Sequence, residues 1–357
     1  MIVNLEILED YVTKNLLRRR EDENLVQYNY TEYCNNEGLW DNITMENRGN
    51  IYEKCSGKLV AKSMPKFMNL CQLSEEKQKQ LLQETEINVT EKMDGCLGIL
   101  YTYKGEVRYN SRGAFDNYVT DKIKELLPKY LNIETILEDL ILIVEVISKE
   151  TRIICNYDFE DLYLITAYRK QDMKECDYNE ICSIASKLNM PVVKQYNMSW
   201  QDLLKFQKQA DWQQEGFVVR IGTDRVKIKS EDYLRIAKLR ANLCKHTIWK
   251  LMKNDSEQKT NVLKTYLDNV PDELVTTAKR YCDELYEDMS KHRSNAERLL
   301  ETLSDIPTRE LQNYFRENPS IYQPCIYCLR SGTSMDKILI RLSEPEKGFE
   351  DVSDMIS

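Results

Sequence analysis

The first two thirds of the chain are dominated by a hydrophobic alternation with a period of two, which is typical of β-strands. Alternating or wholly apolar runs predict strands at 58–61, 87–91, 97–103, 106–110, Leu140–Ile147, 162–168, 215–221 and 225–228. Helical spacing interrupts them at 121–127 and Tyr178–Leu188. Another helix is predicted to begin at Ser199, because Asp202 three residues later completes a capping-box-like start.

The two ends of the chain have a different pattern. Residues 1–40 predict helical structure that continues through Arg18-Arg19-Arg20, with β structure beginning near Arg48. From about Glu231 the spacing is helical, which predicts helices at 233–252, 259–267 and 272–303 and, after Pro307, at 309–317. We expect the tail after Pro345 to be loose. The sequence thus predicts an α/β domain over residues 1–240 and an all-helical domain over residues 241–357.

The composition is that of a soluble globular protein with two cores. The chain has 357 residues, 42% of them hydrophobic and 31% charged. No apolar run approaches the length of a membrane span and the start of the chain lacks a signal-peptide pattern, so we expect a cytoplasmic or nuclear protein that does not bind membranes. Because the net charge is −9, any nucleic acid must bind at a local basic patch.

Cysteine and histidine offer little candidate chemistry. The eleven cysteines show no disulfide framework, and the pair Cys325 and Cys328 has no second pair at the spacing of a metal site. We therefore predict that most of them are reduced thiols in the core. With only two histidines in the chain, we do not expect an active site based on histidine.

Lys92 is the first candidate catalytic residue. It stands two residues before an Asp94-Gly95 turn between two predicted strands, which places a lysine at the rim of a sheet. A neutral lysine amine in such a place can act as a covalent nucleophile. The alternative interpretation is an exposed lysine at an ordinary hairpin turn.

Four further elements follow Lys92 in order. They are Ser111-Arg112-Gly113, then Glu145 inside an apolar strand, then Glu215 at the start of another strand, and finally Lys227 and Lys229. The two lysines are two residues apart, so both side chains leave one face of a strand, where Glu215 can meet them across the hairpin. Each element also has a structural interpretation: Glu145 in an ion pair or on an edge strand, and the lysines on a solvated face.

In this order and spacing, the five elements resemble motifs I, Ia, III, IV and V of the covalent nucleotidyltransferases, which comprise DNA ligases, RNA ligases and mRNA capping enzymes. The closest match is the phage RNA ligase 1 family of the T-even type. Arg48-Gly49 followed by Tyr52, the segment 65–70 around Lys66, and the run from Lys227 to Tyr233 support that choice. Over residues 40–240 the resemblance implies an α+β fold, with an ATP-grasp-like nucleotidyltransferase domain of antiparallel sheets and flanking helices before the all-α domain.

The resemblance also implies a site. Lys92 would attack the α-phosphate of ATP to form lysyl-AMP, with Lys227 and Lys229 as further catalytic residues and with Mg²⁺ held by Glu145 and Glu215. The implied ATP-binding residues are Arg48, Lys66, Glu91, Lys92, Asp94, Gly95, Arg112, Glu145, Glu215, Lys227 and Lys229. Tyr168 and Phe217 are the candidates for stacking on adenine.

The nucleophile must be neutral. The pKa of a free lysine is about 10.4, so reaching neutrality near pH 7 requires about 4 kcal/mol of differential stabilisation. We expect Lys227, Lys229 and Mg²⁺ to lower the pKa of Lys92 by that amount.

Helices after Ser230, where DNA ligases and capping enzymes usually have an OB-fold, favour an RNA ligase. The expected partner is RNA with a 5′-phosphate and a 3′-hydroxyl, by resemblance a tRNA nicked in its anticodon loop. An end-healing kinase/phosphatase would act upstream, and nothing in the sequence indicates an obligate oligomer. Two alternatives stay open: a catalytically silent RNA-binding relative and a GTP-using capping guanylyltransferase.

Overall fold

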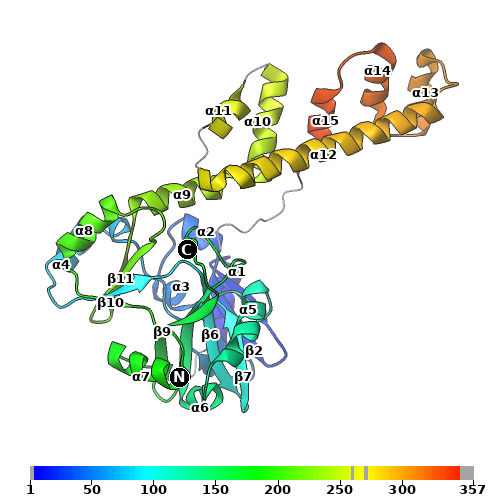
Figure 1. Ribbon diagram of the computed structural model, residues 1–357. Helices are drawn as coiled ribbons and strands as arrows, with labels where there is room; N and C mark the ends of the chain where they lie inside the picture. The colour runs from blue at the N-terminus through cyan, green and yellow to red at the C-terminus, as the bar shows by residue number, and fades with distance from the viewer. Residues whose placement is uncertain (1–3, 259–260, 269–271, 346–357) are drawn as a thin grey trace. The chain divides into compact units, whose positions relative to one another are not determined.

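The computed structural model describes residues 4–258, 261–268 and 272–345 of the chain (Figure 1). Contacts within the chain divide it into two compact units, residues 1–235 and 236–357, and the boundary lies inside helix α9 (Glu231–Asn242). The tail after Pro345 lies outside the described residues, as does the start of the helix predicted at 259–267. Each unit is described by itself.

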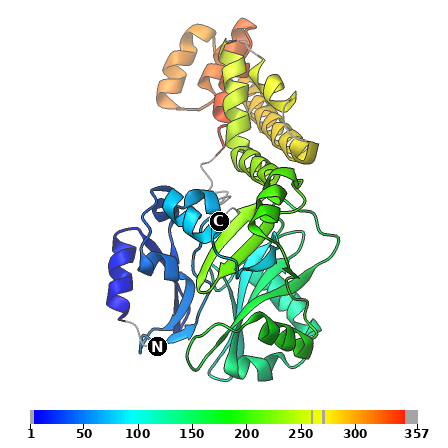
Figure 2. The same cartoon turned by 90° about the vertical axis from the view of Figure 1, so that its left-hand side faces the viewer.

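The first unit begins with α1 (Leu5–Thr13) and a four-stranded antiparallel sheet in the order β1 (Leu17–Glu21), β2 (Leu25–Tyr30), β3 (Arg48–Glu53), β4 (Leu59–Ala61). Helix α1 lies beside this sheet (Figure 2), and α2 (Glu32–Asn36) and α3 (Asn42–Glu46) connect β2 to β3.

The prediction of helical structure through Arg18-Arg19-Arg20 was wrong. The chain leaves the helix at Asn15, whose φ is 57°, and the three arginines lie on β1. Leu17 at the start of this strand is buried, and β1 pairs along its whole length with β2. Tertiary pairing therefore overrides the helical preference of an arginine run.

Two further sheets complete the first unit. One has the order β10 (Gln195–Tyr196), β5 (Asn88–Lys92), β11 (Gly216–Ile221), β12 (Asp224–Lys229), and the other β7 (Glu106–Ser111), β6 (Cys96–Tyr103), β8 (Leu140–Ile147), β9 (Asp161–Arg169). All their ladders are antiparallel. The strands predicted from residue 58 onward are confirmed to within a residue or two at each end.

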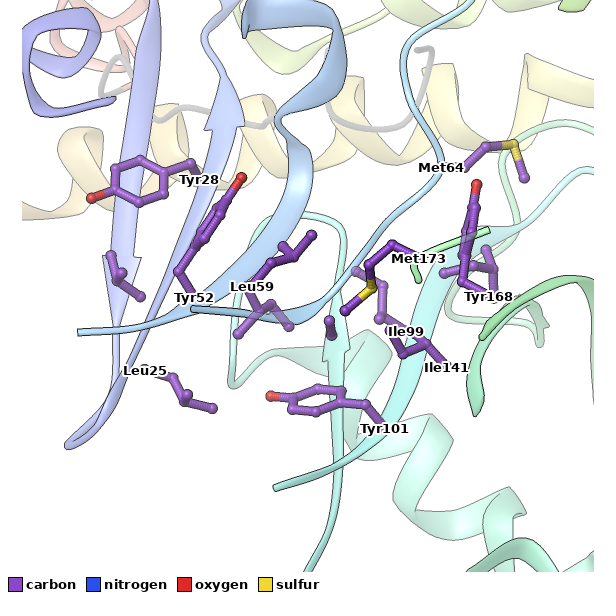
Figure 3. Close-up of a cluster of buried hydrophobic side chains, with 14 of the residues drawn as sticks. Leu25, Tyr28, Tyr52, Leu59, Met64, Ile99, Tyr101, Ile141, Tyr168 and Met173 are labelled. Carbon is purple, nitrogen blue, oxygen red and sulfur yellow. The ribbon is translucent and has the colours of Figure 1, made fainter. Parts of the chain in front are cut away.

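Helices and the first sheet cover these two sheets. Helices α5 (Tyr118–Leu126), α6 (Ile133–Asp139) and α7 (Tyr178–Leu188) pack on one face of β7-β6-β8-β9. The other face shares a core with the first sheet, in which side chains of β2, β3 and β4 meet those of β6, β8 and β9 (Figure 3). Helices α4 (Glu75–Leu82) and α8 (Trp200–Gln209) cover one face of β10-β5-β11-β12. The predicted capping box of Ser199 and Asp202 is present at the start of α8.

Among the described residues, no strand occurs after Lys229. Helices α10 (Lys245–Gln258), α14 (Gln323–Ser331) and α15 (Asp336–Leu342) pack along the long helix α12 (Asp272–Thr302), and α11 (Val262–Asp268) and α13 (Leu311–Glu317) complete the second unit (Figure 1). The continuous helix predicted at 233–252 is broken between α9 and α10, where the Cys244 sulfur accepts a hydrogen bond from the Thr247 N–H. The predicted α+β class with a helical C-terminal part is confirmed.

Candidate active site

The sheet β10-β5-β11-β12 has one apolar face and one polar face. Val89, Phe217, Val219, Val226 and Ile228 point into the core beneath α4 and α8. On the other face the three main strands form cross-strand rows: Lys92, Gly216 and Lys229 share one row, and Thr90, Val218 and Lys227 share the next. The period of two along each strand therefore places the three predicted catalytic lysines on the polar face.

Gly216 stands between Lys92 and Lys229, and only glycine fits there. Its φ is 151°, and a Cβ atom at this position would lie 2.0 Å from the Ile228 carbonyl oxygen. A backbone atom cannot move away as a flexible side chain can. The glycine therefore allows β11 and β12 to run close together beneath the two lysines.

Glu215 joins the two lysines of this row. One carboxylate oxygen lies 2.8 Å from the Lys92 Nζ and the other lies 2.9 Å from the Lys229 Nζ. The Glu215 side chain is 2% exposed and that of Lys229 is 6% exposed, whereas 21% of the Lys92 side chain is exposed. Lys92 is therefore the member of the trio that solvent, or a substrate, can reach.

Lys227 lies one row further along and takes a different set of partners. Its Nζ is 5.0 Å from the centre of the Phe67 ring, and its backbone N–H donates to the Met68 carbonyl at 3.0 Å. The segment that carries Lys66 and Phe67 is thereby held against β12. The sequence pattern 65–70 and the lysine pair are thus parts of one site.

The Asp94-Gly95 turn is held from several sides. The Asp94 carboxylate is 1% exposed and accepts hydrogen bonds from the Tyr233 hydroxyl at 2.7 Å and from the Ile154 and Cys155 N–H groups, both at 2.6 Å. The Gly95 N–H donates to the Glu145 carboxylate at 3.1 Å. The turn after Lys92 is therefore rigid, and Glu145 is brought to it from β8.

Three predicted cations gather around Tyr30 on β2. The Tyr30 hydroxyl accepts hydrogen bonds from Arg112 at 2.9 Å and from Lys66 at 3.4 Å. Lys66 also lies over the rings of Tyr30 and Trp40, at 4.9 and 5.0 Å. Arg48 interacts electrostatically with Tyr30, Arg112 and Glu145. Lys66 and Arg112 are both 8% exposed, so this is a buried basic cluster.

The charge state of Lys92 differs from the prediction. Burial alone would lower the pKa of Lys92, but the carboxylates of Glu215, Glu145 and Asp94 outweigh it and raise that pKa above its ordinary value. Conversely, Lys229 and Lys92 outweigh burial at Glu215 and lower its pKa. Without a bound substrate, Lys227 and Lys229 therefore do not bring Lys92 toward neutrality, because Glu215 holds its ammonium. The expected contribution of Mg²⁺ stays a prediction.

Glu145 and Lys227 also have displaced pKa values. Burial, together with the negative charges of Glu215 and Asp94, raises the pKa of Glu145 to about 7. Burial and the positive charges of Lys229 and Lys92 hold the pKa of Lys227 well below its ordinary value. The site therefore contains a carboxyl group and an amine whose pKa values are both displaced toward neutral pH.

The fit of the carboxylates to Mg²⁺ is uneven. Among the described residues, no set of three or more His, Cys, Asp or Glu side chains is arranged to hold a metal ion. Mg²⁺ needs only one or two protein carboxylates when phosphates and water supply its other ligands. Glu145 fits that requirement, since a cation beside it would offset the burial and the negative charges of Glu215 and Asp94 that raise its pKa. Glu215 can act as a metal ligand only when Lys92 no longer contacts it, because both Glu215 oxygens are paired with lysines.

The other predicted residues divide between the site and the core. The Glu91 N–H donates a hydrogen bond to the Lys194 carbonyl at 2.8 Å, and burial raises the pKa of the Glu91 carboxyl group. Tyr168 is 2% exposed in the core between two sheets, and Phe217 packs against Phe206 on the helix-covered face. Tyr168 and Phe217 thus have packing roles, and neither is placed to stack on adenine.

Sequence reasoning missed Tyr30 and Trp40, which stabilise the basic cluster, and Tyr157, whose hydroxyl accepts a hydrogen bond from the Asp94 N–H at 3.0 Å. The alternation Tyr28, Tyr30 is a signal for β2 that could have identified Tyr30. No local signal points to Tyr157.

Comparison with known protein families agrees with this geometry. The model of the family described as RNA ligase matches residues 44–234, which is more than half of the chain and contains every predicted site residue. The chain belongs to the RNA ligase family. No curated protein sequence matches this RNA ligase homologue.

Solved structures support the fold of this RNA ligase family member. A putative ATP-dependent DNA ligase from Aquifex aeolicus matches with a TM-score of 0.50 and 16% identity, covering 93% of this chain and 100% of that one. An archaeal ATP-dependent RNA ligase matches with a TM-score of 0.50 and 14% identity, covering 79% of this chain and 76% of that one. At this identity the likeness concerns the fold, and it confirms the predicted ligase nucleotidyltransferase architecture. Among the described residues, none of the helices has the length and apolar character needed to span a membrane.

Proposed function

We propose that this protein is an ATP-dependent RNA ligase that joins a 5′-phosphate end to a 3′-hydroxyl end through a lysyl-AMP intermediate. The observation that carries the proposal is the trio of Lys92, Glu215 and Lys229, in which the only partly exposed member is the lysine before the Asp94-Gly95 turn. Membership of the RNA ligase family supplies the substrate class.

In the first step Lys92 attacks the α-phosphorus of ATP, a P–N bond forms, and the bond to pyrophosphate breaks. AMP is then transferred from Lys92 to the RNA 5′-phosphate, which regenerates the amine and leaves a pyrophosphate-linked end. The 3′-hydroxyl finally attacks this end, and AMP leaves as the phosphodiester forms.

Lys92 must lose a proton before the first step. Burial lowers the pKa of Lys92, and only the surrounding carboxylates reverse that effect. Positive charge that arrives with ATP, from Mg²⁺ at Glu145, would offset those carboxylates and let burial dominate. The negative phosphates would offset the burial and the neighbouring cations that lower the pKa of Lys227. Lys227 and Lys229 then face the phosphates as cations and stabilise the charge that develops on the leaving pyrophosphate.

The remaining predicted residues take supporting roles. Arg48, Lys66 and Arg112 form a cationic cluster, in which Lys66 and Arg112 are buried and Arg48 is partly buried. The cluster is suited to the β- and γ-phosphates, because guanidinium groups can bind phosphate through two hydrogen bonds. We assign residues 1–240 to the nucleotidyltransferase domain and residues 241–357 to a helical module for RNA specificity. Repair of a nicked tRNA after an end-healing kinase/phosphatase, by a monomer in the cytoplasm or nucleus, is the corresponding proposal for the biological role.

The test is incubation with α-labelled ATP and Mg²⁺, followed by a denaturing gel and acid treatment of the labelled band. We expect acid-labile label on the wild type and on Lys58→Ala, which removes an exposed lysine, and no label on Lys92→Ala. Lys92→Arg keeps a cation beside Glu215 and should also remain unlabelled, which excludes a loss of charge balance as the cause. Label from GTP but not from ATP would support capping chemistry, and no label from either would support a silent RNA-binding protein.

A further inference from the structure

The strand that carries Lys227 and Lys229 lies at the edge of its sheet, since the order is β10-β5-β11-β12. An edge strand is held on one side only, unless other contacts restrain it. One such contact is the hydrogen bond from the Lys227 N–H to the Met68 carbonyl at 3.0 Å. Another involves Arg225, two residues before Lys227 on the same face of the strand.

Arg225 forms an ion pair with Glu175, and both side chains are 13% exposed. Glu175 lies between β9 and α7, and the same carboxylate oxygen accepts a hydrogen bond from the Thr166 hydroxyl of β9 at 2.6 Å. A backbone bridge between Tyr168 and Glu175 ties this segment to β9 again. The carboxylate is thus attached to the sheet that contains β8 and Glu145, whereas Arg225 belongs to the sheet that contains the lysines.

The ion pair also compensates a repulsion within the hairpin. Arg220 of β11 stands directly opposite Arg225 of β12, and like charges in opposite positions destabilise an antiparallel pair. The second oxygen of Glu175 lies 3.7 Å from the Arg220 Nη1. One carboxylate therefore lies between two arginines and reduces the repulsion that would otherwise push the two strands apart.

We propose that Glu175 and Arg225 are positioning residues that fix Lys227 and Lys229 relative to Glu145. This inference rests on the proposed function, because it concerns the same adenylylation site. Neither residue lies in the trio around Lys92. Within the described part of the chain, their side-chain hydrogen-bond and ion-pair partners are Thr166, Arg220 and each other, and none of these belongs to that site. They act through β12: the pair holds one end of the strand against β9, and the contact with Met68 holds its middle.

Loss of the ion pair between Glu175 and Arg225 should lower the rate constant for adenylylation more than the affinity for ATP. The basic cluster around Tyr30 does not depend on Arg225, so the affinity for the β- and γ-phosphates should change little. A misplacement of about 1 Å at reacting groups can cost roughly 100-fold in rate. For a loosened edge strand we expect a loss of about tenfold or more in the rate constant for lysine adenylylation, with the KM for ATP nearly unchanged.

The experiment measures single-turnover adenylylation of Lys92 over a range of ATP concentrations, together with thermal unfolding. The variants are Glu175→Gln, Arg225→Gln and the double variant. Glu175→Gln keeps a group that can accept the Thr166 hydrogen bond. Arg169→Gln is the matched control, because it removes an ion pair between Arg169 of β9 and Glu180 of α7, whose side chains are 34% and 40% exposed.

We expect both single variants to lose about tenfold or more in rate, the double variant to lose no more than the worse single one, and Arg169→Gln to keep the wild-type rate. The charge-swapped protein, Glu175→Arg with Arg225→Glu, should recover part of the rate. Wild-type rates in Glu175→Gln and Arg225→Gln, or losses that multiply in the double variant, would overturn the inference. So would an equal loss in Arg169→Gln. Absence of label on the wild type would instead overturn the proposed function, so the two failures are distinguishable.

Discussion

Replacing Gly216 by alanine tests whether the close approach of β11 and β12 is required. The new Cβ atom would lie 2.0 Å from the Ile228 carbonyl oxygen and 2.9 Å from the Lys229 Cα, and both are backbone atoms. Relief of the clash therefore requires the two strands to separate at the row that holds Lys92 and Lys229.

The magnitude follows from two independent costs. A φ of 151° is unfavourable for any residue with a side chain, which costs about 1–3 kcal/mol. Overpacking against atoms that cannot turn aside costs about 1–3 kcal/mol more. We therefore expect Gly216→Ala to lower the free energy of unfolding by about 2–6 kcal/mol, which corresponds to a fall in Tm of roughly 5–20 °C for a unit of this size.

Gly222→Ala is the matched control for this prediction. Gly222 lies in the turn of the same hairpin with a φ of 56°, and a Cβ atom there would meet nothing within 4 Å. It should therefore cost only about 1–2 kcal/mol for the left-handed conformation. Circular dichroism melting of both variants measures the difference. A Tm for Gly216→Ala equal to or above that of Gly222→Ala would refute the argument that backbone approach, and not φ alone, requires this glycine.

Two further predictions concern other parts of the site. The pKa of Glu145 is raised from 4.5 to about 7, so between these pH values the folded protein keeps a proton that the unfolded chain releases. The free energy of unfolding should therefore fall as the pH rises from about 4.5 to about 7, by no more than about 3 kcal/mol. Glu145→Gln should remove this pH dependence in thermal melts taken across pH 5 to 8. The control Glu106→Gln, at a side chain that is 76% exposed, should keep it. An unchanged pH dependence in Glu145→Gln would contradict the raised pKa of Glu145. Tyr30→Phe removes the acceptor shared by Arg112 and Lys66, which should cost about 1–3 kcal/mol and raise the KM for ATP about tenfold. Tyr33→Phe, at a residue that is 48% exposed, should leave the KM unchanged, and an equal KM in the two variants would count against a role for the Tyr30 hydroxyl.

Much of the site was predictable because its residues lie on strands with clear periods. The run Leu140–Ile147, which is apolar except for Glu145, gives both bounds of β8. The spacing of two between Lys227 and Lys229 places them on one face, and Glu215 does contact Lys229 across the hairpin. These features depend on local patterning, which sequence contains directly.

The protonation of Lys92 was not predictable in the same way. It depends on a carboxylate 123 positions away in the chain that lies 2.8 Å from the amine, and sequence gives no such distance. The incorrect prediction of a helix at Arg18-Arg19-Arg20 has a related cause. These residues form strand β1 because they pair with β2, and their own sequence does not show that pairing. The break between α9 and α10 contains neither glycine nor proline, so no strong local signal marks it.

The cross-strand rows place a constraint on the length of the hairpin that carries the lysines. Ile221 pairs with Asp224, so only Gly222 and Thr223 form the turn. If one residue were inserted or deleted there and the register shifted by one, Lys227 and Lys229 would rotate into the core beneath α4 and α8, while Val226 and Ile228 would face the site. The length of this two-residue turn therefore determines whether the lysines face the site. We expect members of the family to vary the residues of the turn more readily than its length.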